Sequence, residues 1–522
     1  MHLYHKFQLL ALVSTVLCTL PLHADAESDV RKKAVHYEDF GAKGDGKTDD
    51  SAAIRKAHAH ANHHGLPVRA NDQAVYYIGD QDQPAQIQTN THFGTARFII
   101  DDRAIKNHRV PVFLVPSTQK PVPLPKITKL TRHQKRLAIS LPSDCIVHVS
   151  NRRVKHYIRK GLNPNKGKDQ SDVFLVRKNG LIDPDTPILW DFDHISRIRA
   201  TPIDTSPLTI SGGHFTTIAN NEKSEYDYYA RGITIQRSNV TLQGINHLIT
   251  GEGDHGAPYH GFVNIRECAN VTVLDCSLSG HKTYRTIGRA DKPVSMGSYD
   301  ITVTRAINVS FINCKQLNDI KDSSRWGIMA SNYCKNLSYD GCTLSRFDAH
   351  MGVAGAVIKN STLGHAGLNA IGHGTLTVEN STIYGRNLVN LRSDYGSNWR
   401  GEFIIRNCKF IPACGKPISP SLIGGHNDGS HDFGYPCHMP AKITIHNLHI
   451  DDSQHPNNYK GPSIFANFNP NFTSNQGAQK HPYTLTKEVV LENITTASGL
   501  PLRVSDNTSM FKNVSVQEKQ NK

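Results

Sequence analysis

A seven-residue pattern occurs three times in this chain, as Asn270-Val-Thr-Val-Leu-Asp-Cys276, Asn308-Val-Ser-Phe-Ile-Asn-Cys314 and Asn336-Leu-Ser-Tyr-Asp-Gly-Cys342. Related copies follow it, ending at Ser361, Ser381, Cys408, Asn447 and Asn493. The Cys or Ser that ends the first six copies recurs after 38, 28, 19, 20 and 27 residues. This spacing indicates a structural repeat of about 20 residues that carries loop insertions.

Each copy is a short run of alternating apolar and polar residues that ends at a polar turn. One such coil cannot bury its apolar side alone, so neighbouring coils must stack into a continuous core. The Asn at the turn is expected to form a ladder along the stack, as in other stacked Asn arrays. An antiparallel sandwich would need regular hairpin turns such as Asn-Gly, which the repeat region lacks. The pattern therefore predicts a parallel β-helix, an all-β fold.

The stretch Phe40-Gly-Ala-Lys-Gly-Asp-Gly-Lys-Thr-Asp-Asp50 precedes a predicted helix over residues 51–63, which ends at Gly65. Thr48 or Asp49 is expected to cap this helix, so the Asp pair is interpreted as structural. The stretch resembles the start of the pectate-lyase-like superfamily, which includes polysaccharide lyases, polygalacturonase-type hydrolases and phage tailspikes. The resemblance implies a right-handed parallel β-helix with an N-terminal capping helix, and a polysaccharide as ligand or substrate.

The first residues are typical of an export signal. An apolar run over residues 7–22 is followed by Ala24-Asp25-Ala26, a sequence like that of a cleavage site. We expect residues 1–26 to be removed, the mature protein to be secreted or periplasmic, and no integral membrane segment to remain.

The rest of the chain divides by pattern into three parts. Residues 27–104 are expected to form the N-terminal cap and first coils, and residues 201–515 the parallel β-helix. Residues 105–200 lack the repeat and are rich in Pro and basic residues, so we expect an inserted basic β-rich subdomain there.

The charge is concentrated in one segment. The chain has a formal net charge of +14, and residues 101–200 hold 20 Lys and Arg against 9 Asp and no Glu. A basic exported protein favours an anionic partner, which outside the cytoplasm usually means a uronate or sulfated polymer or an acidic membrane surface, although a merely solvated basic surface is the alternative. No nucleic-acid-binding motif is present, so nucleic acid is not expected as a partner.

Cysteine usage argues against a metal site. The chain has 10 Cys but no C-x-x-C pair, so zinc is not expected. Cys276, Cys314, Cys342 and Cys408 share one repeat position, which predicts a stack of buried thiols. No cofactor is predicted; calcium assists some β-helix lyases, but the proposed groove has few acidic residues and many Arg.

The densest polar cluster lies between Arg325 and Arg400. In Ser345-Arg-Phe-Asp-Ala-His-Met351, alternation directs Arg346, Asp348 and His350 to one face. Such a set fits β-elimination from a uronate, in which a cation neutralises the carboxylate, a base removes the C5 proton and an acid protonates O4.

The predicted roles follow from this chemistry. We assign Arg392 as the carboxylate neutraliser, His350 as the base and Tyr395 as the acid. Asp348 or Asp394 is expected to orient His350 or Arg392. The residues held in reserve for catalytic roles are His373, Asn369 and Arg325. The residues expected to contact substrate are Arg325, Trp326, Arg346, Asn390, Asp394, Trp399, Arg400, His260 and Arg289.

Two other functions fit the same fold. A polygalacturonase-like hydrolase needs two carboxyl groups across the scissile bond, and Asp322, Asp348 and Asp394 are the candidates. A non-catalytic carbohydrate-binding β-helix is the other alternative, but its surface would show rows of aromatic, Asn or Thr residues. The sequence favours an exported lyase of an acidic, uronate-containing polysaccharide, with sulfated glycosaminoglycans among the candidates.

Overall fold

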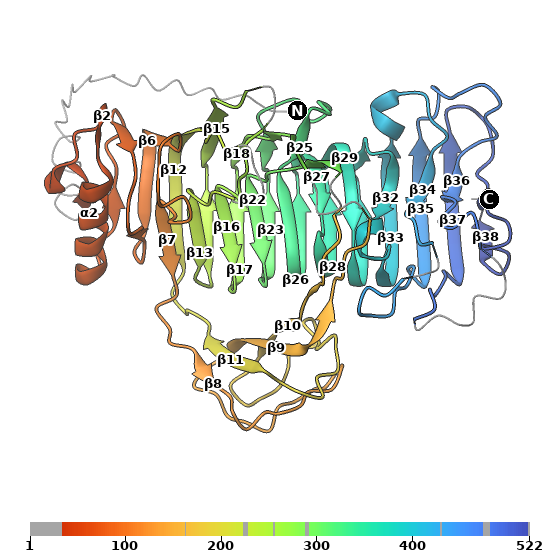
Figure 1. The fold of residues 1–522 in the computed structure, drawn as a ribbon, viewed down its shortest axis with the longest axis horizontal. Coiled ribbons are helices and arrows are strands. Elements are labelled where there is room, and N and C mark those ends of the chain that lie inside the picture. The colour runs from red at the N-terminus through yellow and green to blue at the C-terminus, as the bar shows by residue number, and fades with distance from the viewer. Residues whose placement is uncertain are drawn as a thin grey trace, which may run out of the picture.

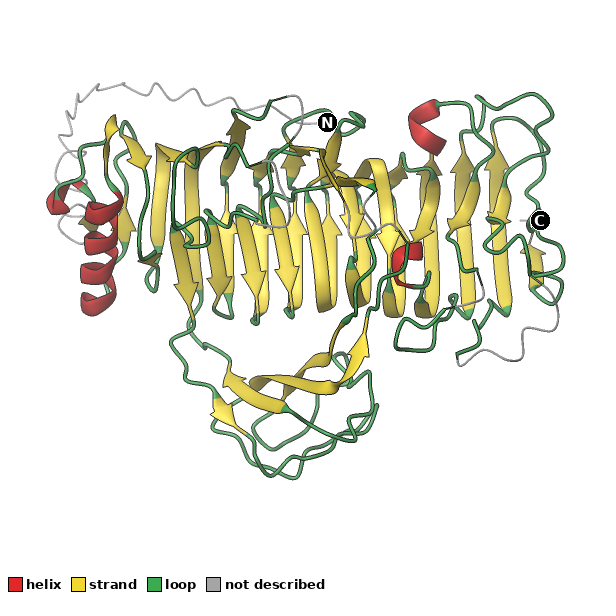
Figure 2. Cartoon of the chain, in the orientation of Figure 1, coloured by secondary structure: helices red, strands yellow, loops and turns green. Residues whose placement is uncertain are grey.

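The computed structural model is a right-handed parallel β-helix, which confirms the predicted fold class (Figures 1 and 2). The structure describes residues 34–161, 163–222, 228–253, 256–287, 292–428, 431–472 and 481–519. The expected export signal, residues 1–26, lies outside these ranges. In the described ranges, no helix is both long and apolar enough to cross a bilayer.

One parallel sheet winds through the whole body. Its strands are β1 (Val35–His36), β2 (Asp45–Asp49), β3 (Val68–Arg69), β4 (Val75–Ile78), β5 (Ala85–Gln86), β6 (Thr91–Asp101), β7 (Phe113–Pro116), β12 (Leu208–Ile218), β13 (Ile233–Gln236), β14 (Val240–Gln243), β15 (Asn246–Thr250), β16 (Val263–Arg266), β17 (Ala269–Leu274), β18 (Ser277–Leu278), β22 (Ile301–Thr304), β23 (Ile307–Ile312), β24 (Lys315–Gln316), β26 (Met329–Asp340), β27 (Thr343–Asp348), β28 (Met351–Lys359), β29 (Thr362–Ala370), β30 (Gly372–Glu379), β31 (Thr382–Ile383), β32 (Asn387–Leu391), β33 (Trp399–Phe410), β34 (Ser421–Gly424), β35 (Lys442–Ile450), β36 (Ser463–Phe465), β37 (Glu488–Thr496) and β38 (Ser515–Lys519). Smaller elements outside this sheet are η1 (Glu38–Phe40), η2 (Ser393–Tyr395), η3 (Pro412–Gly415) and the strand pairs β19 (His281–Lys282) with β25 (Arg325–Gly327) and β20 (Tyr284–Ile287) with β21 (Pro293–Met296).

Helix α2 (Ser51–His64) covers the N-terminal end of the body, as predicted (Figure 1). Its N-cap residue is Asp50 rather than Thr48 or Asp49, but the Asp50 carboxylate makes no capping bond to the helix; it accepts hydrogen bonds from the Lys43 and Gly44 amides at 2.6 and 3.1 Å. Asp49 accepts the amide of Ser51 at 2.9 Å. The Asp pair therefore ties the Gly-rich turn to the helix start.

The predicted Asn ladders are present and hold the turns in register. One runs through Asn239, Asn270, Asn308 and Asn336, with successive side-chain amide bonds of 2.9–3.0 Å. A second runs through Asn360, Asn380, Asn407, Asn447 and Asn493, with bonds of 2.7–3.3 Å. Every one of these Asn residues has φ between +48° and +59°, a conformation that Asn tolerates better than most residues.

The predicted thiol stack lies on the inner side of the second ladder. Cys276, Cys314, Cys342 and Cys408 are buried and none forms a disulfide. Their repeat position continues as Ser361 and Ser381, where each hydroxyl accepts the backbone amide of the coil before it. Small side chains at this corner let adjacent coils approach closely.

An antiparallel sheet interrupts the solenoid between β7 and β12. It consists of β8 (Val122–Pro123), β9 (Cys145–His156), β10 (Lys168–Val176) and β11 (Arg197–Pro202), and it has its own apolar core (Figure 1). Lys335 on β26 anchors this subdomain, because its ammonium lies 2.8 Å from the Asp172 carboxylate and both side chains are almost fully buried. Ile146 and Val173 also pack against the body.

Replacement of one ladder residue tests how much the turns contribute to stability. We expect Asn380→Ala to lower the free energy of unfolding by about 1–2 kcal/mol, because Ala is strained at φ +48° and cannot bond to Asn360 or Asn407. Asn380→Gly keeps the backbone freedom, so its loss should be smaller. Urea midpoints of the three proteins measure the effect, and unchanged midpoints in both variants would contradict it.

Candidate functional site

A pocket of about 850 Å³ lies where the loop between β9 and β10 of the inserted subdomain meets the body of the helix. Arg159 and Lys160 enter it from the insertion, beyond β9. His350 and Arg392 enter it from the coils, after β27 and β32 respectively. The pocket thus combines residues that are about 190–235 positions apart in sequence.

Asp348, the last residue of β27, is the centre of the pocket's ionic network. Its carboxylate accepts hydrogen bonds from Arg392 Nη1 at 2.7 and 2.9 Å and from the Tyr299 hydroxyl at 3.0 Å, and it pairs with Arg346 Nη2 at 2.9 Å. The side chain is completely buried. Burial alone would raise the pKa of Asp348, but the two guanidinium groups outweigh it and lower the pKa.

Asp394 links the two arginines that reach the pocket from opposite sides. Its Oδ2 accepts from Arg392 Nη2 at 2.9 Å and from Arg159 Nη2 at 2.8 Å. Burial opposes ionisation, but Arg392 and Arg159 lower the pKa of Asp394 to about 2. Asp394 therefore stays negatively charged at any pH near neutrality and fixes both guanidinium groups.

His350 is held in one orientation by two neighbours. Its Nδ1 lies 3.0 Å from Asn332 Oδ1, and its Nε2 lies 3.0 Å from Arg159 Nη2. An amide oxygen only accepts and a guanidinium only donates, so Nδ1 carries the hydrogen and Nε2 presents its lone pair. Burial and the nearby Arg392 lower the pKa of His350 to about 3, so the ring is neutral.

The network carries an excess of positive charge. Three arginines, Arg159, Arg346 and Arg392, face two carboxylates, and at the pocket wall the charge of Lys160 is balanced by that of Asp428. An anionic ligand group complements this excess. Aromatic side chains complete the wall: Trp326 lies 5.0 Å from the Arg346 guanidinium and Phe433 lies 5.6 Å from the Lys160 ammonium.

The structure brings together six residues that the sequence singled out, namely Asp348, His350, Arg392, Asp394, Arg346 and Trp326. Arg325 lies apart from the pocket lining, where it pairs with Asp322 at 3.3 Å and donates to the Gly280 carbonyl. Asn369 and Asn390 bond to each other at 2.8 Å as another coil-to-coil amide pair.

Two expected positions are wrong. Trp399 does not lie in a loop beside the groove; it begins β33, is completely buried, and donates to the Gly374 carbonyl. Tyr395 lies behind His350 in an aromatic cluster and is only 3% exposed. The sequence favours an insertion that presents both residues beside the groove, whereas the turn η2 buries Tyr395 and β33 begins at Trp399.

Three further expected residues lie in other places. His373 and Arg400 line a pocket of about 800 Å³ against residues 185–189 of the insertion, where Trp190 meets the His373 ring edge-on. His260 lines a third pocket, beside β16. Arg289 lies outside the described residues.

Sequence reasoning missed Arg159, Lys160, Tyr299 and Asn332. The basic composition of residues 101–200 indicated an anionic partner but gave no means of choosing among its many Lys and Arg. Within the described residues, no group of three or more His, Cys, Asp or Glu is placed to hold a metal ion. The expectation that no metal is required stays a prediction.

Removal of the central carboxylate tests the network. We expect Asp348→Asn to lower the free energy of unfolding at neutral pH by about 3 kcal/mol or more, because it removes the buried ion pair of Arg346 and leaves the buried Arg392 paired with Asp394 alone. The pKa of Asp348 is lowered on folding, so its contribution is present above the unfolded pKa and is lost as pH falls through the folded pKa.

Denaturant titrations at neutral and acidic pH measure this difference, which should shrink below about pH 4. Asp322→Asn is the control, because Asp322 pairs with Arg325 near the surface and should contribute under about 1 kcal/mol. Equal losses in the two variants would contradict a special role for Asp348.

Comparison with known proteins supports the fold. The sequence matches no protein-family model and no curated protein. Among solved structures, the tailspike gp49 of Pseudomonas phage LKA1 aligns with a TM-score of 0.50 and 13% identity, over 92% of this chain and 84% of that one. The gp54 tailspike of Acinetobacter baumannii bacteriophage AP22, in complex with capsular saccharide, aligns with a TM-score of 0.55 and 11% identity, over 94% and 80%. These similarities show that the chain shares the parallel β-helix fold of tailspikes.

Proposed function

We propose that this protein is an exported polysaccharide lyase that cleaves a uronate-containing polymer by β-elimination in the pocket around His350. One observation carries the proposal: a neutral His350 directs its Nε2 lone pair to the Arg159 guanidinium, and the Arg392 guanidinium is close enough to act on its charge. Proton removal next to a carboxylate requires an unprotonated base at the C–H bond and cations that stabilise the negative charge developing on the carboxylate.

The reaction follows from these positions. The uronate carboxylate binds Arg159, which then gives up its hydrogen bond to His350 Nε2, and Arg392 supports the same charge. Nε2 takes the proton from C5, the electrons of that C–H bond form the C4–C5 double bond, and the C4–O4 bond breaks. The departing O4 takes a proton from an acid at the pocket wall.

Tyr299 replaces Tyr395 as the acid in this proposal, because Tyr299 lines the pocket and Tyr395 does not. Burial and the Asp348 carboxylate raise the pKa of Tyr299 to about 12, so it keeps its proton at neutral pH. The Tyr299 hydroxyl donates to Asp348 at 3.0 Å, so in this step it turns from Asp348 to O4 and gives its proton to the alkoxide as the C4–O4 bond breaks.

The carboxylates of the network favour elimination over hydrolysis. A glycosidase needs one carboxyl group whose raised pKa keeps it protonated until it donates to the leaving group. Asp348 and Asp394 are both paired with arginines, which lower their pKa values. The AP22 tailspike, which binds a capsular saccharide, supports a polysaccharide as the ligand of this fold.

Substitution of the base tests the proposal directly. We expect His350→Ala to reduce kcat by about 100- to 10,000-fold, because it removes the proton acceptor. The 4,5-unsaturated uronate that elimination forms is measured by its ultraviolet absorbance, with chondroitin, dermatan and heparan sulfates, hyaluronan, alginate and pectate as substrates. His214→Ala is the matched control, since His214 is exposed on β12, away from the pocket.

The same assay separates the two tyrosines, because Tyr299→Phe should lower kcat more than Tyr395→Phe does. New reducing ends without ultraviolet absorbance would replace the lyase with a hydrolase. A polymer that binds without being cut would indicate a carbohydrate-binding protein.

The low pKa of His350 gives a second prediction. A base with a pKa lowered to about 3 stays unprotonated as pH falls through the ordinary histidine range. We therefore expect kcat/KM to show no acidic limb near the ordinary histidine pKa of about 6.5. Initial rates from about pH 4 to 8 measure this, and a loss of activity with a midpoint near 6.5 in the wild type, but not in a control polymer-binding assay, would contradict His350 as the base.

A further inference from the structure

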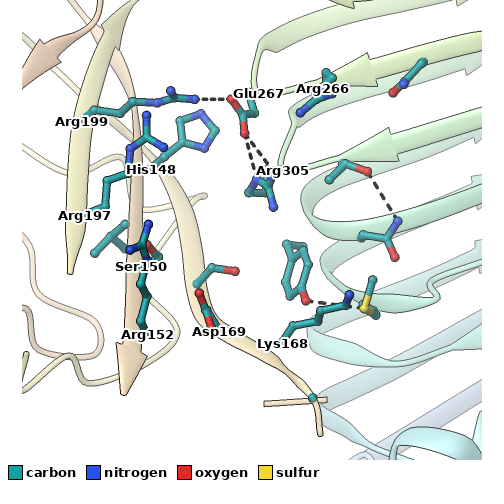
Figure 3. Close-up of a pocket in the computed structure, with 18 of the residues that line it drawn as sticks. His148, Ser150, Arg152, Lys168, Asp169, Arg197, Arg199, Arg266, Glu267 and Arg305 are labelled. Atoms are coloured by element: carbon teal, nitrogen blue, oxygen red, sulfur yellow. Dashed lines mark hydrogen bonds and ion pairs between the residues drawn. The ribbon is translucent and has the colours of Figure 1, made fainter. Parts of the chain in front are cut away.

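The pocket that His260 lines, of about 620 Å³, lies between the inserted subdomain and the body of the helix (Figure 3). Strands β9 and β11 of the insertion form one wall, and β16, β22 and β26 of the body form the other. Figure 3 shows Arg197 and Arg199 on the insertion side facing Arg266, Glu267 and Arg305 on the body side.

This pocket is strongly basic. Six cationic side chains line it, against two carboxylates, Asp169 and Glu267. The six are Arg152, Lys168, Arg197, Arg199, Arg266 and Arg305. A cavity with four more positive than negative charges concentrates anions.

Glu267 pairs with two of these cations and leaves the charge of the others in place. It pairs with Arg199 from the insertion and accepts hydrogen bonds from Arg305 Nε and Nη2 at 3.2 and 3.0 Å. Burial alone would raise the pKa of Glu267, but its cationic neighbours and His148 lower it to about 2. Among the described residues, the side chains of Arg152, Arg197 and Arg266 form no ion pair.

Two buried polar side chains indicate that a ligand of this pocket carries hydrogen-bonding groups as well as negative charge. The ring nitrogens of His148, which is 8% exposed, and Oδ1 of Asn264, which is 5% exposed, lack hydrogen-bond partners among the described residues. Burial lowers the pKa of His148 to about 4, so the ring is neutral and adds no charge. An amide oxygen accepts only from a donor, which a sugar hydroxyl supplies and a bare anion does not.

The basic pocket adjoins the proposed catalytic pocket. Asn332 lines the basic pocket, and its Oδ1 is the atom that holds His350 Nδ1 at 3.0 Å. The segment that returns to β10 also serves both, because Arg159 and Lys160 line the catalytic pocket whereas Gly167 and Lys168 line the basic one.

We propose that the basic pocket is a binding site for an acidic saccharide, in which Arg197, Arg266 and Arg152 bind carboxylate or sulfate groups and Asn264 and His148 bind hydroxyls. This rests on the proposed function in one respect: the saccharide bound there is the non-reacting part of the polymer cleaved at His350. The site therefore selects polymers with closely spaced anionic groups.

The test removes the unpaired cations and measures binding without turnover. In a His350→Ala background, we expect Arg197→Ala with Arg266→Ala to weaken binding of uronate oligosaccharides, sulfated and unsulfated, by at least about tenfold in calorimetric titrations. The dependence of affinity on salt should also become shallower, because fewer ionic contacts form. Lys126→Ala with Lys178→Ala is the control, because it removes the same charge from exposed positions of the inserted subdomain that do not line the pocket.

Equal weakening in the two double variants would overturn the site in favour of a general effect of net charge. The substitutions at Arg197 and Arg266 should weaken binding of the saccharide more than binding of a DNA duplex, because the proposed site is specific for saccharides. Equal weakening of the two would also overturn the site. Calorimetry reads binding alone, so failure of the lyase proposal leaves this test intact. If the lyase proposal holds, the same pair of substitutions in the active enzyme should raise KM for long chains and leave kcat unchanged.

Discussion

The whole structure depends on one constraint: each coil of a parallel β-helix must present the same geometry to the coil above and the coil below. Parallel strands pair in register, so a residue type that suits one corner suits that corner in every coil. The two Asn ladders and the Cys and Ser stack satisfy this constraint with side chains that bond along the axis. A solenoid built in this way has a uniform surface, so distinctive chemistry has to come from departures from the repeat.

The charged network around Asp348 is such a departure. Burial of a carboxylate costs desolvation free energy unless the group is paired and hydrogen-bonded. Here Arg346, Arg392 and Tyr299 together offset that free energy. The same pairing fixes Arg392, while Asp394 fixes Arg159 on the opposite wall. Donors held in place before a ligand arrives lose little entropy on binding, which is the condition for electrostatic stabilisation of a developing charge.

The repeat and the capping motif predict the fold because both are local in sequence. Strand alternation predicts that Arg346, Asp348 and His350 share one face, and in the structure both Arg346 and His350 lie close to Asp348. The expectation for Tyr395 and Trp399 rests instead on a loop insertion, and the structure has the turn η2 and the start of β33 at those positions. Arg159 could not be predicted for a different reason. It lies 191 residues from His350 in a segment without periodicity, and only the docking of the insertion brings its guanidinium to Nε2 of His350.

That docking has to be rigid for either pocket to exist. The buried Lys335–Asp172 pair, the apolar contact of Ile146 and Val173 with the body, and the bridge from Arg199 to Glu267 fasten the insertion at separate points. A subdomain on a flexible linker would not hold a guanidinium 3.0 Å from an imidazole of the body. One docked insertion thus turns the flat side of a solenoid into a groove with two walls, and because most of the added wall is basic, the groove suits a chain that carries negative charge along its length.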